Sequence, residues 1–161
     1  MASFPEPGEH VPDFSLPGGR LTEGHFLRHD YELCSQRGRP LVLAFYPGDG
    51  TPVCTRQLCS YSHALDGLSD LGAEVWAISP QDVSSHEAFA RRHDLRMPLL
   101  ADTDLVVARM FGIALPGLGL RRSVFLIAAD GTLRWKHVSW VGATFQSVHK
   151  LKGRIAALTE H

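Results

Sequence analysis

The stretch FYPGDGTPVCTRQLCS, residues 45–60, carries two of the three cysteines in the chain. It follows an apolar run and includes a corner rich in proline and glycine, and its cysteines, Cys54 and Cys59, lie five positions apart. This spacing is longer than the C-x-x-C loop in which many redox-active dithiols are found. The stretch therefore indicates that these two thiols are not used as a C-x-x-C dithiol.

Thr51 and Pro52 predict that a helix begins within this stretch. Threonine is a good N-cap, and proline at the first helical position loses nothing by lacking an N–H. Cys54 would then lie in the first turn, where free backbone N–H groups and the helix dipole stabilise an anion. A cysteine in such a place is expected to react as a thiolate. Cys54 is therefore a candidate nucleophile, and the alternative is a small buried core residue.

The same helix would keep Cys54 and Cys59 apart. A rise of ~1.5 Å and a turn of ~100° per residue separate their Cα atoms by roughly 8 to 9 Å and their side chains by about 140°. A disulfide needs Cα atoms closer than about 7 Å. The pair can be bridged only if the first turns unwind, so Cys54 would react in the folded helix and Cys59 would reach it after local unfolding. The alternative is that Cys59 is a buried residue on the core face.

The composition is that of an ordinary globular protein. The 161 residues fit one domain, residues 1–161, with 44% hydrophobic and 20% charged residues. A net charge of −1 gives no indication of a nucleic-acid or membrane-surface partner. The start of the chain, MASFPEPGEH, lacks the basic and apolar regions of a secretory signal. We therefore expect a cytoplasmic protein, in which a close cysteine pair is more often catalytic or metal-binding than structural.

Strands that alternate with helices predict an α/β fold. Short apolar runs within residues 39–47, 73–79 and 97–102 are typical of buried strands. The stretch SVFLIAADGTLRWKHV, residues 123–138, predicts two strands joined at Asp130-Gly131, a strong hairpin signal that makes the sheet mixed.

The remaining segments are predicted to be helices or an extended entry. Residues 1–19 are rich in proline and glycine and predict a loop-like entry, with a short strand over residues 11–16. Helices are predicted over residues 52–68 (ending near Gly72), 82–93, 103–111 and 144–158.

These residues resemble a known family. Pro47, Thr51 and Cys54 match the P-x-x-x-T-x-x-C signature of the peroxiredoxins, which are cysteine-based peroxidases. The longer string FYP…TPVCTRQLC is similar to the Q-type subfamily, also called bacterioferritin comigratory proteins. VPDFSL, MPLLAD and an arginine before VFLIAADG also resemble family segments, in the family's order, from about residue 8 to 138.

The resemblance implies a thioredoxin-like fold: a mixed central sheet flanked by helices, with an N-terminal extension. It implies an activity that reduces hydrogen peroxide or organic hydroperoxides. Cys54 would be the peroxidatic thiolate, Thr51 would offer its hydroxyl to thiolate and peroxide, and Pro47 would shield the pocket. Arg122 would hold the thiolate and orient the peroxide, and Cys59 would be the resolving thiol.

The resemblance also implies the partners of the protein. The sulfenic acid on Cys54 would condense with Cys59 to a disulfide. A thioredoxin or a glutaredoxin would then reduce this disulfide by exchange. No metal, haem or flavin is expected, and the protein would be a monomer or a dimer.

The chain departs from the family pattern at several positions. Gln57 stands where many peroxiredoxins have glutamate, and Val124 stands in place of a small hydroxylated residue. Arg121 and Arg122 are adjacent, and on a strand only one of them would face the pocket. Residues 21–39 are longer and less familiar than the usual hairpin.

The remaining cysteine and the histidines offer weaker signals. Cys34 is predicted to be a bystander, an alternative resolving thiol or the site of an intermolecular disulfide. With His25 and His29 it forms only a loose metal-ligand pattern. Four further histidines are predicted to lie on helix surfaces, namely His63, His86, His93 and His149.

Three other functions remain open from the sequence. A one-cysteine peroxidase would use an external thiol in place of Cys59. A thioredoxin-type oxidoreductase without peroxidase activity is disfavoured because C-x-x-C is missing. A non-catalytic relative would retain Cys54 within a binding or scaffold protein.

Overall fold

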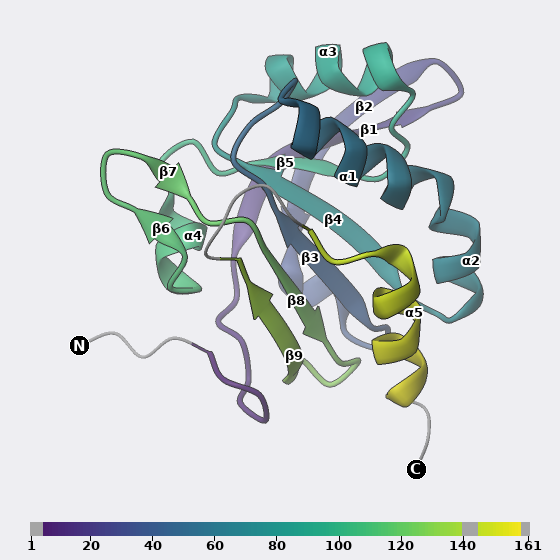
Figure 1. Ribbon diagram of the computed structural model, residues 1–161, viewed down its shortest axis with the longest axis vertical. Helices are drawn as coiled ribbons and strands as arrows, with labels where there is room; N and C mark the ends of the chain where they lie inside the picture. The colour runs from purple at the N-terminus through teal and green to yellow at the C-terminus, as the bar shows by residue number, and fades with distance from the viewer. Residues whose placement is uncertain (1–4, 140–144, 159–161) are drawn as a thin grey trace.

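The computed structural model describes residues 5–139 and 145–158, which form a mixed sheet covered on both faces. Within these residues, seven strands form one sheet in the order β2-β1-β5-β4-β3-β8-β9, and β6 and β7 form a small separate hairpin (Figure 1). The strands are β1 (Ser15–Thr22), β2 (His25–Glu32), β3 (Leu41–Phe45), β4 (Glu74–Ser79), β5 (Leu99–Ala101), β6 (Ala114–Leu115), β7 (Gly119–Leu120), β8 (Ser123–Ile127) and β9 (Leu133–Val138). The helices are η1 (Leu33–Gln36), α1 (Pro52–His63), α2 (Leu65–Asp70), α3 (Val83–His93), α4 (Val106–Met110) and α5 (Val148–Ala157).

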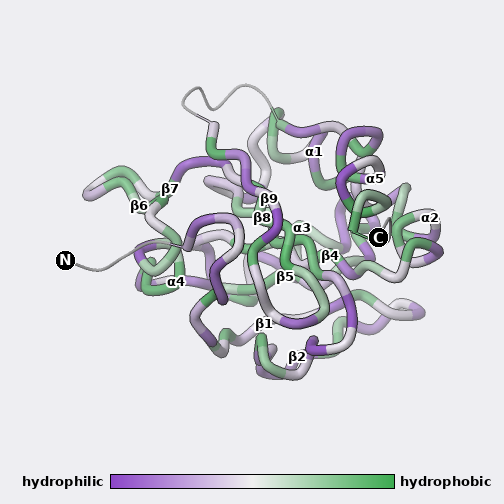
Figure 2. The backbone as a smooth tube through the Cα atoms, turned by 90° about the horizontal axis from the view of Figure 1, so that it is seen from below, coloured by the Kyte–Doolittle hydropathy of each residue, from purple (hydrophilic) through white to green (hydrophobic). Residues whose placement is uncertain are grey.

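The central strands confirm the predicted α/β class and the mixed sheet. β3 pairs in parallel with β4 and antiparallel with β8, and β8 pairs antiparallel with β9 across the predicted hairpin. All residues of β3 and β8 are buried, because helices or loops cover both faces of these strands. In Figure 2, β4, β5 and β8 lie in the centre of the molecule.

Alternate residues of the central strands divide the core into two layers. Leu41, Leu43 and Phe45 of β3 face a layer formed with the N-terminal segment and α4. Val42 and Ala44 face the other layer, formed with α1, α2, α3 and α5. Figure 1 shows α1, α2 and α5 lying across this second face, which also contains Cys54.

The N-terminal part of the chain is more ordered than the sequence predicts. The bounds predicted for the loop-like entry (residues 1–19) and for its short strand (residues 11–16) are wrong: residues 11–14 form no strand, and Ser15–Thr22 pairs with His25–Glu32 in an antiparallel hairpin. The turn contains Glu23 and Gly24, both with positive φ. Strand β1 also pairs with β5, where a Cβ on Gly18 would lie 2.6 Å from the Leu99 carbonyl oxygen. Glycine permits this close approach because it has no side chain. In the sequence, however, the same glycines are typical of a loop.

Three predicted helices have different bounds in the structure. The helix predicted over residues 52–68 is divided at Ala64 into α1 and α2. Helix α4 begins at Val106 rather than near residue 103, because Leu105 adopts a left-handed conformation. Helix α5 begins at Val148, since the Ser147 side chain accepts a hydrogen bond from the Lys150 N–H; the predicted start at Thr144 lies outside the described residues.

Across residues 5–139 and 145–158, no helix combines the length and apolar character needed to cross a membrane.

We predict opposite stability changes for two glycine substitutions. Gly18→Ala should lower the free energy of unfolding by about 1–3 kcal/mol, because the new methyl group meets the backbone of β5. Gly153→Ala should raise it by about 0.5–1 kcal/mol, because Gly153 lies within α5 with no neighbour near its Cβ position. Urea denaturation of both variants measures these changes, and an unaffected Gly18→Ala would show that β1 is not fixed against β5 as described.

Candidate active site

Cys54 lies in the first turn of α1, as the N-cap prediction requires. Thr51 precedes the helix in an extended conformation, and its Oγ1 accepts a hydrogen bond of 3.3 Å from the Cys54 N–H. The Thr51 hydroxyl also lies 3.5 Å from the Gly48 carbonyl oxygen. Cys54 is fully buried, so the free N–H groups of the first turn act in a site that water does not fill.

The Cys54 sulfur accepts a hydrogen bond from a buried arginine. Nη2 of Arg122 lies 3.0 Å from Cys54 Sγ, and the Arg122 residue is 4% exposed. A buried guanidinium is costly unless a negative charge accompanies it, and a thiolate supplies that charge. The contact places a cation and fixed donors against the sulfur, and these donors can stabilise negative charge on an oxygen that departs during reaction at this sulfur.

A line of hydrogen bonds extends from Arg122 along α1. Nη1 of Arg122 donates to Gln57 Oε1, and Gln57 Nε2 lies 3.3 Å from the Tyr61 hydroxyl. Tyr61 donates in turn to the Gln146 carbonyl oxygen at 2.6 Å. Burial raises the pKa of Tyr61 to about 12, despite the opposing effects of Gln57 and Arg122, so the phenol remains a donor. Gln57 thus holds the guanidinium with a neutral amide oxygen.

The loop before α1 is fixed by a second polar cluster. Asp49 accepts a hydrogen bond of 2.6 Å from the Tyr46 hydroxyl and one of 2.7 Å from the Ser85 hydroxyl. His86 Nδ1 lies 2.8 Å from the Asp49 carboxylate. Burial would raise the pKa of Asp49, but hydrogen bonds from His86, Tyr46 and Ser85 and the His86 charge outweigh it, so the pKa lies below its usual value.

This arrangement of a buried cysteine, an arginine and a capping threonine can be compared with known proteins. The sequence profile of the AhpC/TSA family matches residues 7–136. The chain belongs to the AhpC/TSA family.

Two sequence relatives indicate which subfamily this AhpC/TSA family member resembles. It is 31% identical over 155 residues to a putative peroxiredoxin bcp of Coxiella burnetii, covering 91% of this chain and 98% of that protein. It is 30% identical to the chloroplastic peroxiredoxin Q of Triticum aestivum, over 84% of this chain and 67% of that protein. The resemblance to peroxiredoxins of the Q type is therefore confirmed.

The solved structures agree on the fold. The reduced 2-Cys peroxiredoxin of Plasmodium vivax superposes with a TM-score of 0.87 at 21% identity, covering 96% of this chain and 97% of that one. The predicted thioredoxin-like fold is therefore confirmed.

Cys59 lies on α1 with Cys54, in an unbroken helix. All three cysteines fall within the described residues and carry free thiols. Burial raises the pKa of the partly buried Cys59 thiol, so this group remains protonated in the helical form. In the helical form, therefore, the Arg122-bound sulfur of Cys54 and the protonated thiol of Cys59 lie apart on the same helix.

The two other predicted site residues lie at the surface. Pro47 is exposed, and its carbonyl oxygen lies 3.4 Å from Gln81 Nε2. Thr51 is also exposed and caps α1 as described above. The structure thus brings Thr51, Cys54 and Arg122 together through direct hydrogen bonds, while Pro47 belongs to the loop that precedes them.

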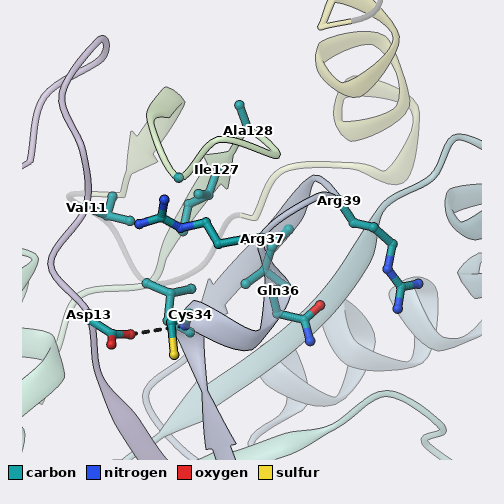
Figure 3. Close-up of a pocket in the computed structure, with 11 residues that line it drawn as sticks. Val11, Asp13, Cys34, Gln36, Arg37, Arg39, Ile127 and Ala128 are labelled. Atoms are coloured by element: carbon teal, nitrogen blue, oxygen red, sulfur yellow. Dashed lines mark hydrogen bonds between the residues drawn. The ribbon is translucent and has the colours of Figure 1, made fainter.

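Cys34 lies far from this chemistry in the fold. It is exposed in η1, whose Leu33 packs in the core layer on the other face of the sheet from Cys54. Its backbone N–H donates to Asp13, and Figure 3 shows its sulfur pointing away from Arg37. The sheet therefore lies between the segment that carries Cys34 and the layer that contains Cys54. In residues 5–139 and 145–158, no three His, Cys, Asp or Glu residues are grouped to hold a metal ion.

Several residues of this site differ from what the sequence predicts. His86 was predicted to lie on a helix surface, but it is fully buried, because α3 packs against the loop that carries Asp49. Its place in α3 gives no local signal of this burial. Gln57 was noted only as a departure from the family, and the sequence could not show its bond to Arg122. Val124 packs in the second core layer.

We predict that the two adjacent arginines differ in their effect on the reaction with peroxide. Arg122→Met should lower the second-order rate constant for Cys54 oxidation by about 100- to 1,000-fold, because it removes the donor to the sulfur. Arg121→Met is the matched control and should change this rate constant little. Stopped-flow measurement with hydrogen peroxide tests both, and a larger effect at Arg121 would contradict the geometry.

We predict a pH dependence for the Asp49 contribution to stability. Because its pKa is lowered in the folded protein, the contribution is present above the usual carboxyl pKa of about 3.9 and is lost as the pH falls through the folded value. The difference in unfolding free energy between the wild type and Asp49→Asn should narrow as the pH falls into the acid range. Urea titrations across this range measure it, and a difference independent of pH would contradict the shift.

Proposed function

We propose that this protein is a thiol peroxidase that reduces hydrogen peroxide and organic hydroperoxides, acting as one domain over residues 1–161. The carrying observation is the fully buried Cys54 sulfur, 3.0 Å from the Arg122 guanidinium in the first turn of α1. Relatives named peroxiredoxin, which match most of the chain, support the assignment.

In the first step, the Cys54 thiolate attacks one oxygen of the hydroperoxide. The S–O bond forms, the O–O bond breaks, and sulfur loses two electrons to the peroxide. The departing RO⁻ takes a proton and leaves as ROH, or as water when the substrate is hydrogen peroxide. Arg122 stabilises the negative charge on the departing oxygen, Thr51 orients the peroxide through its hydroxyl, and Pro47 limits the entry of water. Cys54 is left as a sulfenic acid.

In the second step, the Cys59 sulfur attacks the Cys54 sulfenic acid. The S–S bond forms, the S–O bond breaks, and the hydroxyl leaves as water with the Cys59 proton. Because both cysteines lie on α1, the helix has to unwind at its first turns before the sulfurs meet. Unwinding also exposes Cys59 to water, which removes the burial that keeps it protonated.

In the third step, an external dithiol protein of the thioredoxin or glutaredoxin type reduces the disulfide by thiol exchange. Its two thiols become a disulfide, and Cys54 and Cys59 regain their thiols. The cytoplasm remains the predicted location, although the wheat relative is named as chloroplastic.

We predict that Cys54 and Cys59 separate into two kinetic roles. Cys54→Ser should abolish peroxide consumption, because no other thiol is placed against Arg122. Cys59→Ser should consume about one equivalent of peroxide, then stop in a thioredoxin-coupled assay and accumulate sulfinic acid at excess peroxide. Cys34→Ser is the matched control, and it should keep full turnover.

Each alternative has its own outcome in this experiment. Full turnover of Cys59→Ser with thioredoxin would establish a one-cysteine mechanism and overturn the resolving role. Disulfide reduction without peroxide consumption in the wild type would establish a thioredoxin-type oxidoreductase. Inactivity in both assays would leave a binding protein.

A further inference from the structure

A buried pair of an aspartate and a histidine lies behind the loop that leads into α1. Asp49 is in this loop, two residues before the N-cap Thr51, and His86 is on α3. The side chains are 7% and 0% exposed, and His86 Nδ1 lies 2.8 Å from Asp49 Oδ2. Neither residue contacts the Cys54 sulfur through a described hydrogen bond, so the peroxidase chemistry gives no direct reason for the pair.

Both ring nitrogens of His86 have a hydrogen-bond partner. Nε2 lies 2.9 Å from the Leu100 carbonyl oxygen, which can only accept, so Nε2 carries a proton. Nδ1 lies 2.8 Å from a carboxylate oxygen of Asp49, which also accepts a hydrogen bond from the Ser85 hydroxyl. His86 therefore bridges the Asp49 carboxylate and the Leu100 carbonyl oxygen. It connects the loop to both α3 and β5.

The loop has little else of its own to hold its shape. Asp49 is flanked by Gly48 and Gly50, and Gly50 has a φ of +81°. Glycine loses more conformational entropy than other residues when it is fixed, so ordering this loop is costly. Besides the side chain of Asp49, its described tethers are the bonds of Gln81 to the Asp49 N–H and the Pro47 carbonyl, and the 3.5 Å contact of the Thr51 hydroxyl with the Gly48 carbonyl oxygen. Asp49 therefore fixes the point from which Thr51 caps α1.

We propose that the Asp49–His86 pair is a positioning latch that sets the balance between the helical and the unwound first turns of α1. With the latch closed, the first turn is helical and Cys54 faces Arg122, the form that reacts with peroxide. When the latch opens, the loop and first turn are released and Cys54 can approach Cys59. This inference rests on the proposed function, in which Cys59 resolves the Cys54 sulfenic acid.

Two substitutions of His86 separate its two links. The amide nitrogen of glutamine can occupy the place of Nε2, so His86→Gln keeps the bond to Leu100 and loses the link to Asp49. The amide nitrogen of asparagine can occupy the place of Nδ1, so His86→Asn keeps a donor to Asp49 and loses the bond to Leu100. Quenched mass spectrometry after rapid mixing with hydrogen peroxide measures the rates of sulfenic acid, disulfide and sulfinic acid formation.

The latch predicts rate changes of opposite sign. In His86→Gln, Cys54 oxidation should slow by about tenfold, disulfide formation should accelerate, and less sulfinic acid should form at high peroxide. His86→Asn should lie nearer the wild type in both rates. Amide hydrogen exchange of residues 54–58 should be faster in His86→Gln than in His86→Asn. A general loss of structure would instead slow both chemical steps.

The outcomes that would overturn the latch are distinct from those that would overturn the resolving thiol. Equal exchange at residues 54–58 in wild type and His86→Gln, or slowing of both steps together, would contradict the latch. A wild type that forms no Cys54–Cys59 disulfide would contradict the resolving role, while the exchange and oxidation rates would still test the latch. If His86→Gln does not fold, Ser85→Ala removes one neutral donor from Asp49 and should give smaller changes of the same signs.

Discussion

The hydrogen bond from Arg122 to the Cys54 sulfur is the constraint on which the rest of the site depends. Arg122 is 4% exposed and its buried charge needs a polar partner, and the fully buried Cys54 sulfur needs donors to stabilise negative charge. Each group therefore offsets part of the free-energy cost of burying the other. The surrounding bonds follow from this requirement: Gln57 holds the second nitrogen, and Tyr61 orients Gln57. Thr51 fixes the helix turn that presents the sulfur.

The same geometry imposes two incompatible demands on α1. The reaction with peroxide needs an intact first turn, because the helix N-terminus and Arg122 act together on the Cys54 sulfur. The proposed Cys54–Cys59 disulfide would need that turn to open, because Cys59 is held elsewhere on the same helix. The Pro-Gly corner and the Asp49–His86 pair lie at the start of α1, next to the turn that is intact for one step and open for the other. A loop flanked by glycines and held by side chains can release the turn without disturbing the sheet.

The sequence predicts those features that local chemistry decides. Thr51 and Pro52 mark the start of α1, and the Asp130-Gly131 turn marks the β8–β9 hairpin, because caps and turns depend on neighbouring residues. The β1–β2 hairpin was missed because the glycines of β1 are typical of a loop, and their close packing on Phe26 and β5 becomes visible only in three dimensions. His86 was wrongly expected at a helix surface for the same reason: its partners are 37 and 14 residues away in the chain.

The most direct test of the account is peptide-level mass spectrometry after one equivalent of hydrogen peroxide, with free thiols trapped. The account predicts a loss of two hydrogens that maps to Cys54 and Cys59, with Cys34 still free. A stable sulfenic acid on Cys54 beside a free Cys59 would contradict the resolving step. Oxidation that begins at Cys34 or Cys59 and spares Cys54 would contradict the central claim, that the Arg122-bound sulfur is the one that reacts.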